Sequence, residues 1–102
     1  MKNKYKLKYS PQFYVDINNI VIYIKHNLKN NLAADNLISK VEKAINRRCK
    51  SLENYEQYKT NANNTYYRIY INNYTIFYTV SENIMEVRRI VYGRRNMEEL
   101  IY

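Results

Sequence analysis

YYRIYINNYTIFYTVSENIMEVRRIVYG, residues 66–93, decides the fold. It contains three runs rich in Ile, Tyr and Val, the residue types enriched in strands, at 66–71, 74–81 and 84–92. Asn72-Asn73 separates the first two runs, and Asn tolerates the positive φ of a tight hairpin turn. Glu82-Asn83 separates the second run from the third. The segment predicts a three-stranded antiparallel meander.

Two helices are predicted upstream of the meander. Ser10-Pro11 has the pattern of an N-cap followed by a first-turn proline. Apolar residues then recur at helical spacing: Phe13, Ile17, Ile20, Val21, Ile24 and Leu28. Asn30-Asn31 interrupts the pattern, and a second helical stripe follows at Ala34, Leu37, Ile38, Val41, Ile45, Cys49 and Leu52. The short polar link predicts an antiparallel helical hairpin.

The remaining segments complete the predicted order. Residues 3–9 alternate Tyr5, Leu7 and Tyr9 with lysines, as in a half-buried strand. Residues 53–65 lack periodicity and are predicted to be a loop, and a short helical tail is predicted from about Met97. The expected fold class is therefore α+β, one domain over residues 1–102, with the helical hairpin on one face of the sheet. The other face is expected to be free and to carry the function.

Charge and composition restrict the partners. The chain has 17 Lys and Arg against 9 Asp and Glu, a net charge of +8, and residues 1–51 account for the whole excess. Such a balance favours a polyanionic partner: nucleic acid, the ribosome or an acidic protein segment. The lysines of residues 1–8 are not followed by an apolar stretch, and no run approaches the ~20 residues of a membrane span. A cytoplasmic protein that does not enter membranes is expected.

The sequence lacks the residues that most kinds of catalytic site require. Cys49 and His26 are the single cysteine and histidine, which leaves no ligand set for a metal site. Cys49 falls on the apolar stripe and is expected in the core, whereas His26 is expected to be exposed. Asp16 and Asp35 are interpreted as isolated acids on helix surfaces, and Gly93 alone cannot form a phosphate-binding loop. No metal or cofactor is predicted.

The segment EVRRIVYGRRN, residues 86–96, contains the densest group of side chains that could bind a partner or take part in a reaction. It contains four arginines and a tyrosine: Arg88, Arg89, Tyr92, Arg94 and Arg95. Strand alternation puts Arg88 and Tyr92 on one face and Arg89 on the other with Val87 and Val91, where Arg89 is either a binding residue or a buried, paired arginine. Tyr66, Arg68 and Tyr70 are candidates to join the open face.

Arginines interleaved with tyrosines suit phosphate clamping and base stacking, and they equally suit docking of an acidic peptide. A merely solvated face is the third interpretation, because Asn, Tyr, Ile and Lys make up 51 of the 102 residues and A/T-rich codons alone enrich them.

Three segments in order resemble the RelE/ParE superfamily of toxins of bacterial type II toxin–antitoxin systems. YSPQFYVDINNIVIYI is similar to the opening strand and helix of the family, and YYRIYINNYTIFYTV to its first two meander strands. MEVRRIVYGRRNMEELI resembles its closing segment, with Tyr92 where many members carry His.

The resemblance implies two alternative activities. ParE-type members inhibit DNA gyrase and are not enzymes, whereas RelE-type members are metal-independent, ribosome-dependent mRNA endonucleases. A RelE-type activity would use Arg68, Arg94 or Arg95 on phosphate and Tyr92 or Tyr78 near the proton transfer. Thr75 and about Leu100 stand where RelE-type toxins carry an arginine and a tyrosine, which favours the ParE-type activity.

Both activities imply growth inhibition, a role in plasmid stabilisation and neutralisation by a cognate antitoxin with an acidic C-terminal segment, in a hetero-oligomer. A detoxified member that only binds antitoxin is the third alternative. Residues expected to contact target or antitoxin are Arg68, Tyr70, Arg88, Arg89, Tyr92, Arg94 and Arg95.

Overall fold

A computed structural model describes residues 5–51, 58–59 and 65–93. The elements follow in the order β1 (Lys6–Tyr9), α1 (Pro11–Ile22), a π-helical turn η1 (Tyr23–Asn27), α2 (Asn31–Cys49), β2 (Tyr58–Lys59), β3 (Thr65–Ile71), β4 (Tyr74–Ser81) and β5 (Ile84–Tyr92). This order confirms the predicted α+β fold. The predicted C-terminal helical tail lies outside the described residues.

The strands form one five-stranded sheet in the order β1-β5-β4-β3-β2. β1 runs parallel to β5, and the other neighbours are antiparallel. The loop predicted over residues 53–65 is wrong in one part, because β2 lies inside it and pairs with Thr65 and Tyr66 of β3. A two-residue edge strand is held by backbone hydrogen bonds and has no side-chain period for sequence patterns to detect.

Both predicted hairpin turns are present. Asn72 has φ 51° between β3 and β4, and Glu82 has φ 56° between β4 and β5. Asn adopts this left-handed conformation more readily than Glu, so Asn72 is the stronger of the two turn signals. The two turns set the antiparallel meander.

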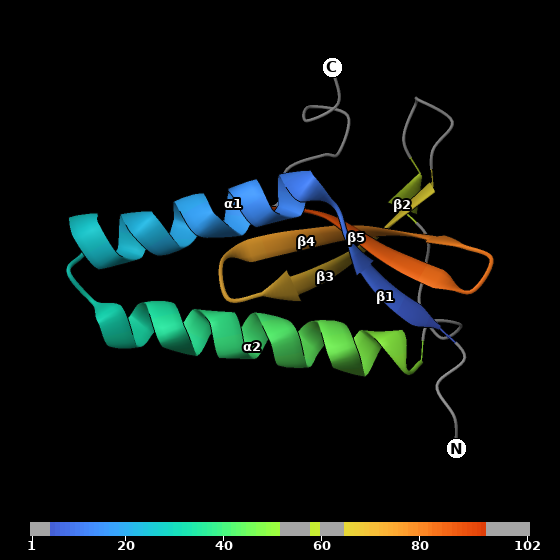
Figure 1. Ribbon diagram of the computed structural model, residues 1–102, viewed down its shortest axis with the longest axis horizontal. Helices are drawn as coiled ribbons and strands as arrows, with labels where there is room; N and C mark the ends of the chain where they lie inside the picture. Colours follow the sequence, from blue (N-terminus) through green and yellow to red (C-terminus); the bar gives the residue numbers. More distant parts are fainter. Residues whose placement is uncertain (1–4, 52–57, 60–64, 94–102) are drawn as a thin grey trace.

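The helices begin at capping residues. The Ser10 hydroxyl accepts a hydrogen bond from the backbone N–H of Phe13 at 3.2 Å, and Pro11 opens α1 as predicted. The Asn30 side chain accepts from the N–H of Ala33 at 3.0 Å, so α2 begins at Asn31, ahead of the first predicted apolar position. Figure 1 shows the two helices lying antiparallel, with the short connection at the end farthest from the chain termini.

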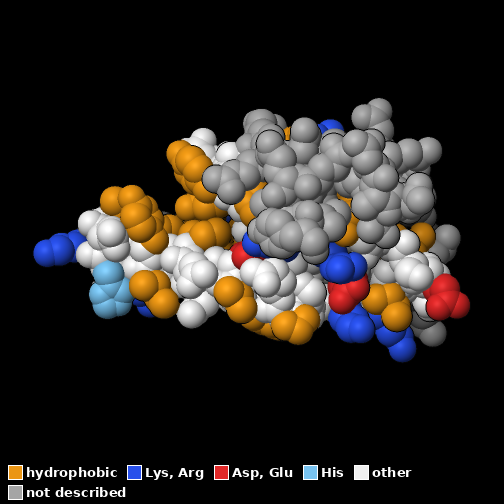
Figure 2. Space-filling view, turned by 90° about the horizontal axis from the view of Figure 1, so that it is seen from above, with side chains coloured by type: hydrophobic (Ala, Val, Ile, Leu, Met, Phe, Trp, Pro, Cys, Tyr) orange, Lys and Arg blue, Asp and Glu red, His pale blue; other side chains and the backbone are white. Residues whose placement is uncertain are grey.

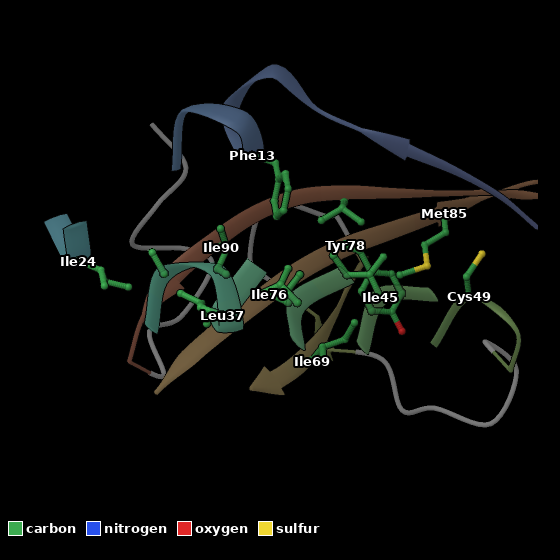
Figure 3. Close-up of a cluster of buried hydrophobic side chains, with 13 residues drawn as sticks. Phe13, Ile24, Leu37, Ile45, Cys49, Ile69, Ile76, Tyr78, Met85 and Ile90 are labelled. Atoms are coloured by element: carbon green, nitrogen blue, oxygen red, sulfur yellow. The ribbon is translucent and has the colours of Figure 1, made fainter. Parts of the chain in front are cut away.

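The core lies between the helical hairpin and the sheet (Figure 3). Buried side chains from α1, η1, α2, β3, β4 and β5 form one cluster: Phe13, Ile24, Ala34, Leu37, Val41, Ile45, Cys49, Ile69, Ile76, Tyr78, Met85, Val87 and Ile90. Cys49 is in the core as predicted, and His26 is exposed.

The face of the sheet away from the helices is not the free surface that alternation predicts. Phe77 and Thr75 are fully buried there, and Tyr66 and Val91 are 3% and 8% exposed. β4 is the middle strand of the sheet, and Ile76, Phe77 and Tyr78 are buried in succession. A continuous apolar run of this kind is typical of a strand covered on both faces, and the run is visible in the sequence.

A β-bulge in β5 changes which residues share a face. Tyr78 pairs with Val87 and Phe77 with Arg89, so Arg88 is an extra residue without a partner in the register. Val87 and Ile90 therefore both face the helices, although they are three residues apart. The predicted pairing of Arg88 with Tyr92 on one face fails, because the bulge interrupts the alternation between them.

Asp16 joins α1 to the edge of β5. Its carboxylate accepts from Arg89 Nε at 2.8 Å and Arg89 Nη2 at 3.0 Å, from the backbone N–H of Ile90 at 3.1 Å and from Gln12 Nε2 at 3.0 Å. The interpretation of Asp16 as a surface acid is wrong: this residue is 9% exposed. Residue spacing along α1 indicates the flank on which Asp16 lies, but not that an arginine of β5 reaches it.

We expect Asp16→Asn to lower the free energy of unfolding by about 3 kcal/mol, because it leaves the Arg89 guanidinium without its carboxylate in a largely buried position. Urea denaturation of the purified chain measures this change. Asp35→Asn removes the same charge from an exposed position of α2 and is expected to change stability by no more than about 0.5 kcal/mol. Equal midpoints for the two variants would contradict the role of Asp16.

Candidate functional site

Arg68 and Tyr70 form the surface part of the predicted arginine–tyrosine group. The β3–β4 register puts Arg68 opposite Phe77 and Tyr70 opposite Thr75, on the face away from the helices. The Arg68 guanidinium carbon lies 5.6 Å from the centre of the Tyr70 ring, within cation–π range, and Tyr70 is 44% exposed. Tyr66 shares this face but is buried. The pair places a cation beside a partly exposed aromatic ring on this face.

Tyr92 is not part of this group. It pairs with Tyr74 in the register, on the helix side of the sheet, and the two rings meet edge to face at 5.6 Å. Tyr92 is 64% exposed, and Tyr74 packs against the core. Burial raises the pKa of Tyr74, and the neighbouring Tyr92 and Tyr23 raise it further. Arg68 and Tyr92 therefore lie on opposite faces of the sheet.

The two consecutive arginines of β5 have different surroundings. Arg88, in the bulge, lies 3.6 Å from Glu86 in a surface ion pair, and its side chain is 41% exposed. Arg89 is 17% exposed and bound to Asp16, which is the buried, paired alternative that the sequence left open. Arg94 and Arg95 lie outside the described residues.

Tyr78 is enclosed in the core. Its hydroxyl accepts a hydrogen bond from Arg48 Nη1 at 3.0 Å, and its ring stacks on Tyr67 with centroids 5.1 Å apart. The same Arg48 nitrogen donates to the carbonyl of Arg68 at 2.8 Å, which ties the end of α2 to β3. Tyr78 is 0% exposed, so its hydroxyl does not reach the surface where a substrate would bind.

Sequence reasoning missed Arg48. Residue 48 is seven positions after Val41 and three after Ile45, both of which are buried, so helical periodicity already puts it on the inward side of α2. A charged residue at a core-facing position of a predicted helix can be recognised from the sequence. Its partner, the hydroxyl of buried Tyr78, cannot.

Thr75 is the residue that the resemblance puts at the position of the RelE-type arginine. It is fully buried, and its hydroxyl donates to the carbonyl of Gly93 at 2.5 Å. The N–H of Gly93 in turn donates to the carbonyl of Asn73 at 2.6 Å, and Gly93 has φ 88°. Thr75 therefore fixes the end of β5, and only glycine adopts this backbone conformation readily.

A groove of about 740 Å³ lies between α1 and α2. Its lining is mostly apolar and comprises Tyr9, Phe13, Tyr14, Val15, Ile17, Asn18, Asn19, Val21, Ile38, Val41, Glu42 and Ile45. Tyr14 and Val15 are more than half exposed. Figure 2 shows hydrophobic side chains, in orange, on the surface seen from above. Exposed apolar side chains gathered along a groove are a feature that many protein-binding sites share.

No three His, Cys, Asp or Glu side chains lie together as a metal site needs within residues 5–51, 58–59 and 65–93. Over the same residues, no helix combines the length and the apolar character required to cross a membrane.

Comparison with known proteins gives a family and a fold. Residues 7–97 match the family model described as the ParE toxin of type II toxin–antitoxin system, parDE. No curated protein matches significantly. A chromosomal ParDE system from P. aeruginosa contains a similar chain, with a TM-score of 0.75, 9% identity, and coverage of 91% of this chain and 100% of that one.

Two other solved structures share the fold less closely. The YoeB dimer from Staphylococcus aureus has a TM-score of 0.50 and 24% identity, and the comparison covers 89% of this chain and 99% of that one. The RelB–RelE antitoxin–toxin complex from Methanococcus jannaschii has a TM-score of 0.50 and 22% identity, with coverage of 93% and 99%.

Tyr78→Phe removes the acceptor of a buried hydrogen bond from Arg48. We expect it to lower the free energy of unfolding by about 1 kcal/mol, because Arg48 Nη1 keeps the Arg68 carbonyl as its second partner. Tyr92→Phe removes a hydroxyl from an exposed ring and is the matched control, with little change expected. Chemical denaturation measures both, and an equal loss in the two variants would contradict the core role of the Tyr78 hydroxyl.

Proposed function

Because the chain belongs to the ParE toxin family of type II toxin–antitoxin systems, we propose that it inhibits growth by binding DNA gyrase in the cytoplasm. The observation that carries this proposal is the family match over residues 7–97. In this proposal the protein acts through surface contact, without a catalytic step or a cofactor. The +8 charge speeds encounter with an acidic partner surface.

The surroundings of the candidate catalytic residues also support a binding protein. Thr75 stands at the second-strand position of the RelE-type arginine and bonds Gly93. Tyr78 is buried, and Tyr92 lies on the face opposite Arg68. General acid–base catalysis requires both groups within hydrogen-bond reach of the same phosphate, and these residues do not meet that requirement.

The alternative function is RelE-type cleavage of mRNA on the ribosome. The observation that favours it is the Arg68–Tyr70 pair, because a guanidinium beside an exposed ring suits a phosphate next to a stacked base. Arg94 and Arg95, which lie outside the described residues, would then have to supply the remaining groups, because Tyr92 lies on the opposite face from Arg68. A detoxified member that only binds its antitoxin is the third possibility.

Controlled expression of the chain with parallel labelling by thymidine and by an amino acid distinguishes these functions. We expect DNA synthesis to fall first, with induction of the DNA-damage response, and the purified chain to inhibit supercoiling by gyrase. An immediate fall in protein synthesis with cut mRNA, abolished by Arg68→Ala, would instead establish the alternative. No effect on either label would leave antitoxin binding alone.

We propose that the antitoxin partner places an amphipathic segment in the groove between α1 and α2. The groove is lined from Tyr9 to Val21, and its exposed side chains include the apolar Tyr14 and Val15 beside Asn18, Asn19 and Glu42. A segment that folds on binding gains its affinity by burying such surface. An acidic flank on that segment would complement the basic charge of this chain.

Val15→Asp tests this docking site. Val15 lines the groove and is 51% exposed, so a charge there leaves the core intact but opposes the burial of an apolar partner face. We expect antitoxin affinity to fall at least about tenfold. Ile22→Asp, at a 46% exposed position of α1 outside the groove, is the control. Equal affinity of the two variants in a titration with the antitoxin from the adjacent gene would exclude the groove as its site.

A further inference from the structure

The C-terminal half of α2 presents a basic face to solvent. The basic stripe consists of four exposed side chains spaced three or four residues apart: Lys40, Lys43, Arg47 and Lys50. These positions lie opposite the buried side of the helix, which Leu37, Val41 and Ile45 form. The stripe is separate from the groove, from the Arg68–Tyr70 pair and from Tyr92, so none of these sites accounts for its four cations.

The acidic residues of α2 are kept away from this stripe. Glu42 lines the groove, and Asp35, seven residues earlier, lies on the same side of the helix. A solvated helix surface gains stability from alternating signs at i and i+4, and like charges at these spacings repel. The helix dipole favours Arg47 and Lys50 near the C-terminus of α2, but its effect falls off within the last turn and does not reach Lys40 or Lys43.

We propose that the basic stripe of α2 binds the phosphate backbone of double-stranded nucleic acid. The stripe extends about 15 Å along a straight helix, and duplex DNA presents roughly nine phosphates over that distance. Three of the cations lie within the 19-residue helix α2 and Lys50 is its C-cap, so one rigid element holds them at fixed spacing. The contact requires no particular base sequence.

The stripe fits a duplex better than other polyanions. It contains no aromatic side chain, and single-stranded nucleic acid is typically held by stacking of its bases on such rings. It contains no apolar residue between Lys40 and Lys50 on the outward side, and a folding acidic peptide needs apolar surface to bury. The phosphate backbone of a duplex needs neither aromatic nor apolar side chains, because its regularly spaced charges are bound by cations.

The test compares two variants that each lose three positive charges. The stripe variant carries Lys40→Gln, Lys43→Gln and Arg47→Gln, and the control carries Lys6→Gln, Lys8→Gln and Lys25→Gln at exposed positions of β1 and η1. Lys50 is kept because it is the C-cap of α2. Fluorescence anisotropy with a short duplex DNA of random sequence measures affinity over a range of salt, and circular dichroism verifies that each full-length variant is folded.

We expect the natural chain to bind the duplex and the stripe variant to bind at least about tenfold more weakly at low salt. The slope of log affinity against log salt should fall by about 2.7, since each lost phosphate contact removes ~0.9. The control variant should keep most of the affinity and most of the salt dependence of the natural chain. The proposal would be overturned by an equal loss in both variants, by no binding of the natural chain, or by equal affinity of the natural chain for polyglutamate. The same titration with a duplex RNA identifies which nucleic acid is preferred.

Discussion

The fold depends on the hydrogen bonds that the edge of β5 makes beyond the end of β1. β1 pairs with β5 only from Ile84 to Val87, and beyond that point the backbone of β5 needs other partners. Ser10 supplies two of them, because its N–H donates to the carbonyl of Val87 and its hydroxyl to that of Arg88. Asp16 supplies the next by accepting the N–H of Ile90. The first turns of α1 therefore replace the missing strand, which fixes the helix against the sheet.

The same region decides which arginine is available for binding. Without the bulge at Arg88, the alternation of β5 would carry Arg89 to the side that Val87 occupies in the core. With it, the guanidinium of Arg89 meets the carboxylate of Asp16 and Arg88 stays at the surface beside Glu86. A pair of neighbouring arginines thus divides into one residue that holds the fold together and one that contacts solvent. Counting the arginines of a segment overstates the number that a partner can reach.

Sequence patterns predicted the parts of this molecule whose signal is local. Strand and turn boundaries followed from runs of β-branched and tyrosine residues and from Asn72, and helix starts followed from Ser10 and Pro11. The errors concern contacts between distant segments. Nothing in the composition of α1 indicates that Asp16 meets a residue 73 positions away, and strand alternation cannot foresee a bulge. Arg48 lay on the inward side of a predicted helix, but its partner Tyr78 is set by the packing of the sheet.

These internal partnerships limit the chemistry that the sheet can perform. Arg48, Arg89 and Thr75 each donate to groups of the protein itself, and the Tyr78 hydroxyl accepts from one of them. A side chain held in this way contributes rigidity, and it cannot also move a proton to a substrate that it does not reach. The chemically accessible features of the described residues are instead extended surfaces: an apolar groove, an arginine beside a tyrosine, and a basic helix face. Surfaces of this size and character suit recognition of macromolecules, which agrees with the binding function proposed for this chain.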